Sequence, residues 1–243
     1  VMKRFAQRTL LACALIWLPA AAHAQPFPAG PINLVVPLAP GDAADIAARA
    51  LGEEISRQLK TPVIPINRPG AGGAVGTNGV VKAKKDGRTI LFAQNSALTF
   101  RAALDPRSVT YDALRDLVPL GIASRTPSVL AVRSDAPYKN FAEFIEYAKK
   151  RPAQVRIGHP GAGSVGDFCV QLINALTGSQ IVLVPYTGAG PAVTALHGGH
   201  IEGSVLSLGV LGTHIKSGTF RGLVGSSRYP DFGDIPTLGE LGH

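Results

Sequence analysis

Charged residues are scarce in this sequence, and several other residue types are almost absent. Only 16% of the 243 residues are charged, against about 25% in an average protein, and there are 2 cysteines, 1 methionine and 1 tryptophan. Hydrophobic residues make up 46% of the chain, which excludes a disordered protein. No run of Lys and Arg is interleaved with aromatic residues, so nucleic acid is not an expected partner.

Residues 1–24 have the pattern of a secretory signal peptide. Basic residues near the start precede the apolar run Thr9–Ala22, and Ala22-His23-Ala24 supplies the small residues of a cleavage site. The alternative, a membrane anchor, is disfavoured because the run is shorter than the roughly 20 residues that span a bilayer. We therefore predict cleavage after Ala24 and a periplasmic protein.

Removal of this segment changes the charge and the cysteine content. It holds three basic and no acidic residues, so the formal net charge falls from +8 to +8 − 3 = +5. Cys169 becomes the single cysteine, which excludes an intramolecular disulfide. The remaining positive charge suits an anionic small molecule.

The rest of the chain alternates short apolar runs with amphipathic stretches. This alternation predicts an α/β fold with parallel sheets covered by helices, in two Rossmann-like lobes of about 100 residues each. A helix is expected from Asp42 with its apolar face at Ile46, Ala50, Leu51, Ile55 and Leu59, and another over 140–151 with Phe141, Phe144, Ile145 and Ala148 inward. Strands are expected at 32–38, 62–66, 89–93, 129–132, 155–158, 181–184, 201–207 and 222–225.

The stretch "GHPGAGSVGDF" contains a glycine spacing that is often seen in dinucleotide-binding loops. Gly161, Gly163 and Gly166 form G-x-G-x-x-G between an expected strand and an expected helix. A dinucleotide site also needs an Asp or Glu about 20 residues further on, after the next strand. Residues 184–188 (VPYTG) contain no carboxylate, so no nucleotide cofactor is expected.

The same stretch is close to the nucleophile elbow G-x-S-x-G of α/β-hydrolases, with Ser164 as the serine. His197, His200 and His214 follow it, but without the Asp-then-His order of that fold. A hydrolase-like esterase using Ser164 therefore remains an alternative to a non-enzymatic protein. His197 and His200 flank Gly198-Gly199, a helix-end pattern that explains the histidines without a metal.

Gly-rich loops that lead into helices are general anion sites, because the first helical N–H groups have no intrahelical acceptor. This chain has three such loops, at residues 37–45, 69–73 and 161–164. At the carboxyl ends of strands in two lobes, such loops would face each other across a cleft. A small anion bound there would close the lobes about a hinge.

Five ordered segments resemble the Bug family, the TctC-like substrate-binding receptors of tripartite tricarboxylate transporters. They are "PINLVVPLAPGDAADIAARALGEEIS", "VIPINRPGAGGAVGTNGVVKAKKDGRTILFA", "GHPGAGSVGDF", "VLVPYTGAGPAVTALHGGHIEG" and "HIKSGTFRGLVGSSRYPDFGDIPTLGELG". The resemblance implies a type II periplasmic binding protein topology, with 25–125 and 225–243 as domain 1 and 126–224 as domain 2. It also implies a monomer that captures a small organic carboxylate in the interdomain cleft for the transporter's membrane subunits.

Carried over to this chain, the resemblance implies a ligand site built from the three loops and the strand ends beside them. Its residues are Leu38, Ala39, Pro40, Gly41, Asp42, Ala43 and Asp45; Ala71, Gly72 and Gly73; Asn95 and Ser96; Gly161, Ala162, Gly163 and Ser164; Tyr186 and Thr187; and Ser207.

This chain departs from the family pattern at four places. Asp42 brings an acidic group close to the expected carboxylate site, unless it serves as a helix cap. Val165–Phe168 lacks a histidine that the family often has, and Leu206-Ser207 stands where an Asp-Asn pair is common. Family members also continue beyond the point matching His243, so an incomplete first lobe, and with it a non-functional receptor fragment, is a further alternative.

Overall fold

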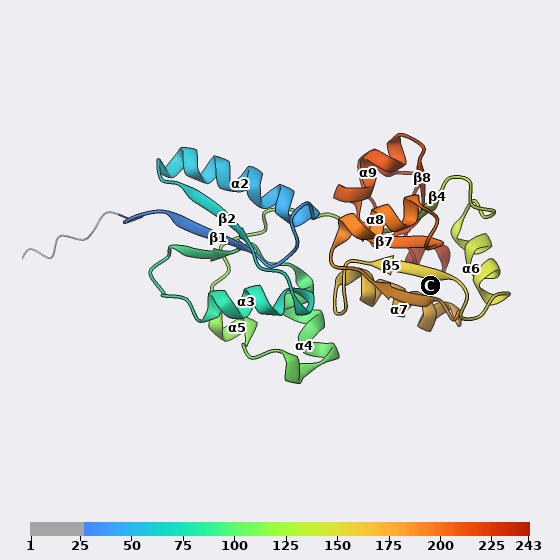
Figure 1. The fold of residues 1–243 in the computed structure, drawn as a ribbon, viewed down its shortest axis with the longest axis horizontal. Helices are drawn as coiled ribbons and strands as arrows, with labels where there is room; N and C mark the ends of the chain where they lie inside the picture. The colour runs from blue at the N-terminus through green and yellow to red at the C-terminus, as the bar shows by residue number, and fades with distance from the viewer. Residues whose placement is uncertain (1–26) are drawn as a thin grey trace, which may run out of the picture.

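Two separate sheets organise the protein. The structure is a computed structural model that describes residues 27–243, so the signal peptide expected at 1–24 lies outside the described residues. Residues 27–116 form a first lobe and residues 128–243 a second lobe beside it (Figure 1). Between residues 27 and 243 no helix is both long and apolar enough to cross a membrane.

The first lobe is a parallel three-stranded sheet with the order β2-β1-β3. Helix α2 covers one face and α3 the other (Figure 1), and Leu34, Val36, Ala48 and Phe92 lie in the core. The three expected strands are confirmed with small shifts at their ends. The elements are β1 (Ile32–Val36), α2 (Ala43–Leu59), β2 (Val63–Asn67), η2 (Ala71–Gly73), α3 (Ala74–Val81) and β3 (Thr89–Leu91).

Helix α2 turns a different face to the sheet from the one expected. It buries Ala44, Ala48 and Gly52, whereas Ile46 is 56% exposed. A methyl group added at Gly52 would lie 3.5 Å from Val63 and 3.6 Å from Leu34. Because small residues let the helix approach the strands this closely, the helix is rotated from the expected face. Ala50 and Leu59 are exposed, whereas Leu51 still packs against the core and Ile55 is half-buried.

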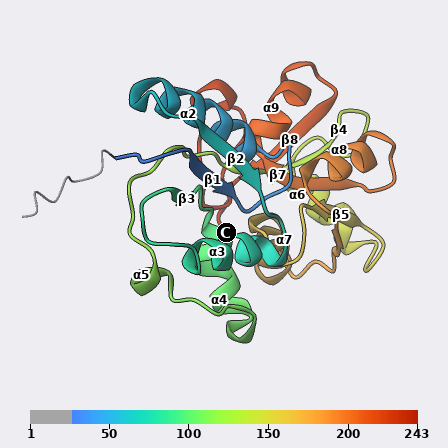
Figure 2. The ribbon, with the colours of Figure 1, turned by 60° about the vertical axis from the view of Figure 1, so that its left-hand side comes forward.

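A short helical region follows β3 and leads out of the first lobe. Figure 2 shows α3, α4 and α5 on the same side of the β1–β3 sheet. The elements are the π-helix η3 (Ser96–Phe100), α4 (Arg101–Leu104), the 3-10 turn η4 (Pro106–Ser108) and α5 (Ala113–Asp116). Residues 117–127 then cross to the second lobe without helix or strand.

The second lobe is a five-stranded sheet with the order β6-β5-β7-β4-β8. Strands β5, β6 and β7 are parallel, but β4 is antiparallel to both β7 and β8. The expected parallel sheet is therefore a mixed one. The elements are β4 (Ser128–Arg133), α6 (Phe141–Lys149), β5 (Arg156–His159), α7 (Val165–Thr177), β6 (Val182–Pro185), α8 (Ala189–His197), β7 (Gly203–Ser207), α9 (Leu208–Lys216) and β8 (Phe220–Gly225).

Helices cover both faces of this sheet and form two cores. Phe144, Ile157 and Val170 belong to the core under α6 and α7. Leu196 and Leu211 belong to the opposite core, under α8 and α9. The inward face expected for the helix over 140–151 is confirmed, since Phe141, Phe144, Ile145 and Ala148 are its buried residues.

Residues 225–243, expected to form part of domain 1, instead belong to the second lobe. Gly225 pairs with Thr237, Ile235 is buried in the core under α8 and α9, and the His243 ring lies 5.9 Å from that of Phe141. The segment contains the 3-10 turns η5 (Pro230–Phe232) and η6 (Gly239–Leu241). Apolar contacts with β8 and α9 hold it there, so within residues 27–243 the chain passes between the lobes once.

Candidate functional site

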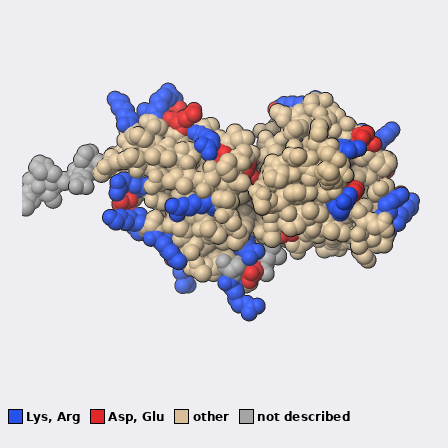
Figure 3. All heavy atoms as spheres, in the orientation of Figure 1, with Lys and Arg blue, Asp and Glu red and all other residues tan. Residues whose placement is uncertain are grey.

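The Gly-rich loops of the two lobes meet, as expected. A methyl group added at Gly72 would lie 2.7 Å from the carbonyl oxygen of Gly163, and one added at Gly188 would lie 2.9 Å from Ala39. We call this contact region the seam: residues 38–45, 71–73 and 100–101 of the first lobe with 161–168, 188 and 207–209 of the second. On the face shown in Figure 3, basic side chains lie mostly toward the outer ends of the lobes and the surface between them is mostly uncharged.

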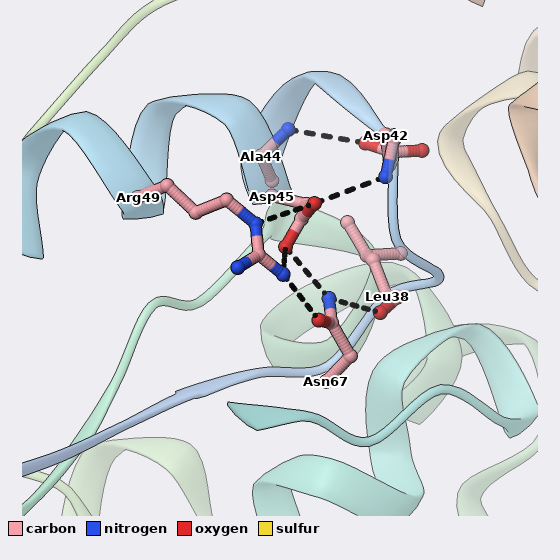
Figure 4. Close-up of polar contacts among 7 residues, drawn as sticks. Leu38, Asp42, Ala44, Asp45, Arg49 and Asn67 are labelled. Atoms are coloured by element: carbon pink, nitrogen blue, oxygen red, sulfur yellow. Dashed lines mark hydrogen bonds and ion pairs between the residues drawn. The ribbon is translucent and has the colours of Figure 1, made fainter. Parts of the chain in front are cut away.

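A buried carboxylate, Asp45, holds the first loop in place (Figure 4). It accepts hydrogen bonds from the Gly41 N–H at 3.0 Å, from Asn67 Nδ2 at 2.9 Å and from Arg49 Nε at 3.1 Å. Asn67 also donates to the Leu38 carbonyl at 3.1 Å. Asp45 is therefore a support of the loop, and Asn67, which the sequence did not single out, is its second support.

Asp42 is the N-cap of α2, as expected: its Oδ1 accepts the Ala44 N–H at 3.2 Å. Burial raises the pKa of Asp42 above its ordinary value, and the neighbouring negative charge of Asp45 adds to this. Burial also raises the pKa of Asp45, but hydrogen bonds from Arg49, Gly41 and Asn67 outweigh it, so that pKa lies below its ordinary value. Two carboxyl groups three residues apart thus shift in opposite directions.

The second-lobe loop is held by the start of α7. Ser164 Oγ accepts the Asp167 N–H at 3.2 Å, and Asp167 Oδ2 accepts the Gly163 N–H at 2.7 Å. This reciprocal arrangement is a helix cap. Within the described residues no recorded hydrogen bond joins Ser164 to a histidine, so its hydroxyl serves as a cap and the geometry of a catalytic serine is not formed.

His159, at the end of β5, is a second support that the sequence did not reveal. It is 2% exposed, and its Nδ1 lies 3.0 Å from the Gly161 carbonyl oxygen. Burial lowers the pKa of His159, and the Asp167 carboxylate only partly offsets this. A neutral imidazole that donates to the carbonyl therefore fixes the base of the loop.

The remaining expected site residues are spread around the seam. Ser207 caps α9 by accepting the Gly209 N–H at 3.3 Å, and a methyl group at Gly209 would lie 3.0 Å from Ala43. Ser96 is buried at the start of η3, and Tyr186 is half-buried beside Gly158. Asn95 and Thr187 are exposed, and no recorded contact of the described chain joins their side chains to the other site residues.

His197, considered both as a metal ligand and as a base for Ser164, and His214, considered only as a base, lie elsewhere on the second lobe. The rings of His197 and His214 flank Phe220, at 6.2 and 5.0 Å between ring centres, and α8 ends at His197. The part of the chain that the structure describes holds no cluster of potential metal ligands. Two open hollows near Phe220 and Ser134 include no residue of the expected ligand site.

Three side chains, those of Phe100, Phe168 and Arg101, join the lobes at the seam. The Phe100 and Phe168 rings stack across it at 4.7 Å with an angle of 12°. Beside them, Arg101 lies over Gly163, where an added methyl group would be 2.9 Å from Arg101 Nη1. Phe168 lies in the segment 165–168 that departs from the family pattern. That departure was the sequence feature that pointed to the Phe100–Phe168 contact.

The arrangement suits a small anion. Helices α7, α8 and α9 of the second lobe and α2 and α3 of the first all begin at or beside the seam. Each helix start offers N–H groups and a partial positive charge. These helix starts suit the binding of a small anion.

Comparison with known proteins agrees with this interpretation. A sequence profile described as the tripartite tricarboxylate transporter family receptor matches residues 47–243. Protein BugT of Bordetella pertussis is 35% identical over 227 residues, which cover 92% of this chain and 69% of BugT.

Similar solved structures carry bound dicarboxylates. MatC from Rhodopseudomonas palustris, with bound malate, has a TM-score of 0.82 and 29% identity over 89% of this chain and 74% of that one. A second R. palustris protein, with adipate, has a TM-score of 0.79 and 28% identity over 89% of this chain and 73% of that one.

Proposed function

Because the chain belongs to the receptor family of tripartite tricarboxylate transporters, we propose that it captures a small organic carboxylate at the seam between its lobes and delivers it to the transporter's membrane subunits. The observation that carries this proposal is the meeting of the Gly72 and Gly163 loops from the two lobes. Members of this family are solute receptors rather than enzymes.

The proposed ligand contacts are backbone groups of the facing loops. The loops at 38–43, 71–73 and 161–164 lie at the seam, and Asp45, Asn67 and His159 hold them from beneath. The N–H groups of Gly41 and Gly163 already donate to Asp45 and Asp167, so the proposed donors are other amides of these loops. A carboxylate that enters such a site replaces its hydrogen bonds to water with hydrogen bonds from N–H groups that the protein holds in place. The malate and adipate found with similar proteins support a dicarboxylate as the ligand class.

Members of the family are periplasmic binding proteins. For this chain we propose export by the segment 1–24, with cleavage after Ala24. The exported chain then acts as a monomer that presents its loaded, closed form to the membrane subunits.

Calorimetric unfolding of residues 25–243 with a panel of acids tests the proposal. The panel contains malate, adipate, succinate, citrate, benzoate and, as a neutral control, succinamide. An acid at about 100 times its dissociation constant is expected to stabilise the folded protein by about 2.7 kcal/mol. A cooperative transition that no acid on the panel raises would contradict carboxylate capture.

Asp42→Asn is expected to strengthen the binding of a carboxylate by about tenfold. The buried Asp42 carboxyl lies in the loop proposed to hold the ligand, and a negative charge there repels a second one. Asparagine is also an effective N-cap, so α2 keeps its start. Isothermal titration of wild type and variant measures the difference.

The pH dependence checks this prediction independently. The pKa of Asp42 is raised, so its unfavourable charge appears as the pH rises through that pKa, and the advantage of Asp42→Asn is expected to grow from pH 4 to pH 7. An unchanged affinity at pH 7 would show that the ligand carboxylate is held away from this loop.

A further inference from the structure

Arg101 has an incompletely satisfied guanidinium group at the seam. Its side chain is 19% exposed, and its Nε is buried with no hydrogen-bond partner among the described residues. Its ion pair with Asp105 is 3.4 Å long, beyond the 2.7–2.9 Å of a strong charge-assisted bond. Buried hydrogen-bond donors are almost always paired. A guanidinium with an unpaired Nε and a long ion pair is therefore suited to bind an additional anion.

The position of Arg101 places it among the proposed ligand loops. It begins α4 in the first lobe, directly after the π-helix η3, and its Cδ and Nη1 lie over Gly163 of the second lobe. π-helical turns occur frequently at functional sites. The neighbouring stack of Phe100 on Phe168 holds this part of the first lobe against the start of α7.

We infer that Arg101 is the cationic residue with which this chain recognises a carboxylate of its ligand at the seam. This inference rests on the proposed function. The backbone N–H groups of the loops can donate to any small anion. A planar guanidinium favours a carboxylate, because two of its N–H groups can donate to the two carboxylate oxygens. Arg101 belongs to the first lobe but lies against the second, so it contacts a ligand at the seam only when the two lobes meet. Recognition of the ligand's charge is thereby coupled to closure of the lobes.

The test compares an acid with its monoamide. Isothermal titration with adipate, malate and their monoamides is carried out on wild type, Arg101→Gln, Arg101→Lys and the control Arg107→Gln, which removes an exposed charge in the same segment. We expect wild type to bind the diacid at least 10-fold tighter than the monoamide. In Arg101→Gln, the affinity for the diacid is expected to fall 10- to 100-fold. The ratio of diacid affinity to monoamide affinity is then expected to approach one.

The controls separate charge recognition from a structural role. Arg101→Lys is expected to retain part of the preference, since it keeps the charge and loses the paired geometry, and Arg107→Gln is expected to match wild type. Equal losses for diacid and monoamide in Arg101→Gln would show that Arg101 only holds the lobes together, and overturn the inference. Unchanged diacid binding in that variant would overturn it too. If wild type binds none of the probes, the proposed function itself fails, and this inference with it.

Discussion

Gly72→Ala is expected to weaken carboxylate binding by at least about 100-fold. The added methyl group would lie 2.7 Å from the Gly163 carbonyl oxygen and 3.0 Å from its carbon, both backbone atoms of the opposite lobe. Because neither loop can yield without losing its own supports, the lobes are forced apart. If bringing the two lobes together costs about 3 kcal/mol more in the variant, the apparent affinity for the ligand falls by roughly 100-fold.

Gly178→Ala is the matched control for this variant. Gly178 has a φ of 68°, close to the 62° of Gly72, but no atom of residues 27–243 lies within 4 Å of an added methyl group. Both variants therefore carry a similar backbone strain of about 1 kcal/mol, while Gly72→Ala alone disturbs the seam. Titration with malate and adipate measures the affinity, and small-angle X-ray scattering of the free protein measures the separation of the lobes. A Gly72→Ala protein with wild-type affinity and wild-type radius of gyration would refute the role of this contact.

Asp45→Ala is expected to destabilise the protein by about 3 kcal/mol. The substitution removes the acceptor of three hydrogen bonds, from Gly41, Asn67 and Arg49, and leaves partly buried donors unpaired. The Arg49 side chain is 49% exposed, so its share is reduced by solvent screening and most of the loss comes from the Gly41 amide and Asn67. Urea unfolding followed by far-ultraviolet circular dichroism gives the free energy.

The pH dependence of this effect has a defined sign. The pKa of Asp45 is lowered in the folded protein, so its stabilisation is present above the unfolded pKa, near 3.9, and is lost as the pH falls through the lower folded pKa. The difference between wild type and Asp45→Asn is therefore expected to be full at pH 6 and to shrink below about pH 4. The control is Glu54→Ala, which removes an exposed carboxylate from the same helix and is expected to leave stability unchanged. A difference that stays constant down to pH 2 would contradict the assignment.

Local patterns predicted the elements and the loops of the site. The strand over 32–36 follows from β-branched and apolar residues between proline and a Pro-Gly turn, and Asp42 was recognised as a cap from its place before an apolar-periodic stretch. The caps and Gly-rich turns act over a few residues, so the sequence contains all the information they need. The position of the loops at the carboxyl ends of strands in two lobes predicted that they face each other, and the family resemblance supplied the residues of the expected ligand site.

Features that depend on distant contacts were not predictable in this way. The direction of β4 is fixed by pairing with β7 and β8, about 75 and 95 residues away. The buried face of α2 depends on how closely Gly52 approaches β1 and β2. Arg101 lies against Gly163 because two lobes meet, and no periodicity around Arg101 contains that contact. The segment after β8 was placed by family topology, whereas Ile235 and Phe232 bind it to the nearer apolar surface.

The connector between the lobes, residues 117–127, has a mechanical consequence. Residues 117–127 connect α5 to β4 as a mostly exposed segment without helix or strand, on which Val118, Leu120 and Ile122 are 73–84% exposed. A connector of this length sets the effective concentration of one lobe around the other, in the millimolar range for a short tether. Orientation comes from the interlocking surfaces themselves, above all the Phe100–Phe168 stack and the glycines that allow the backbones to touch.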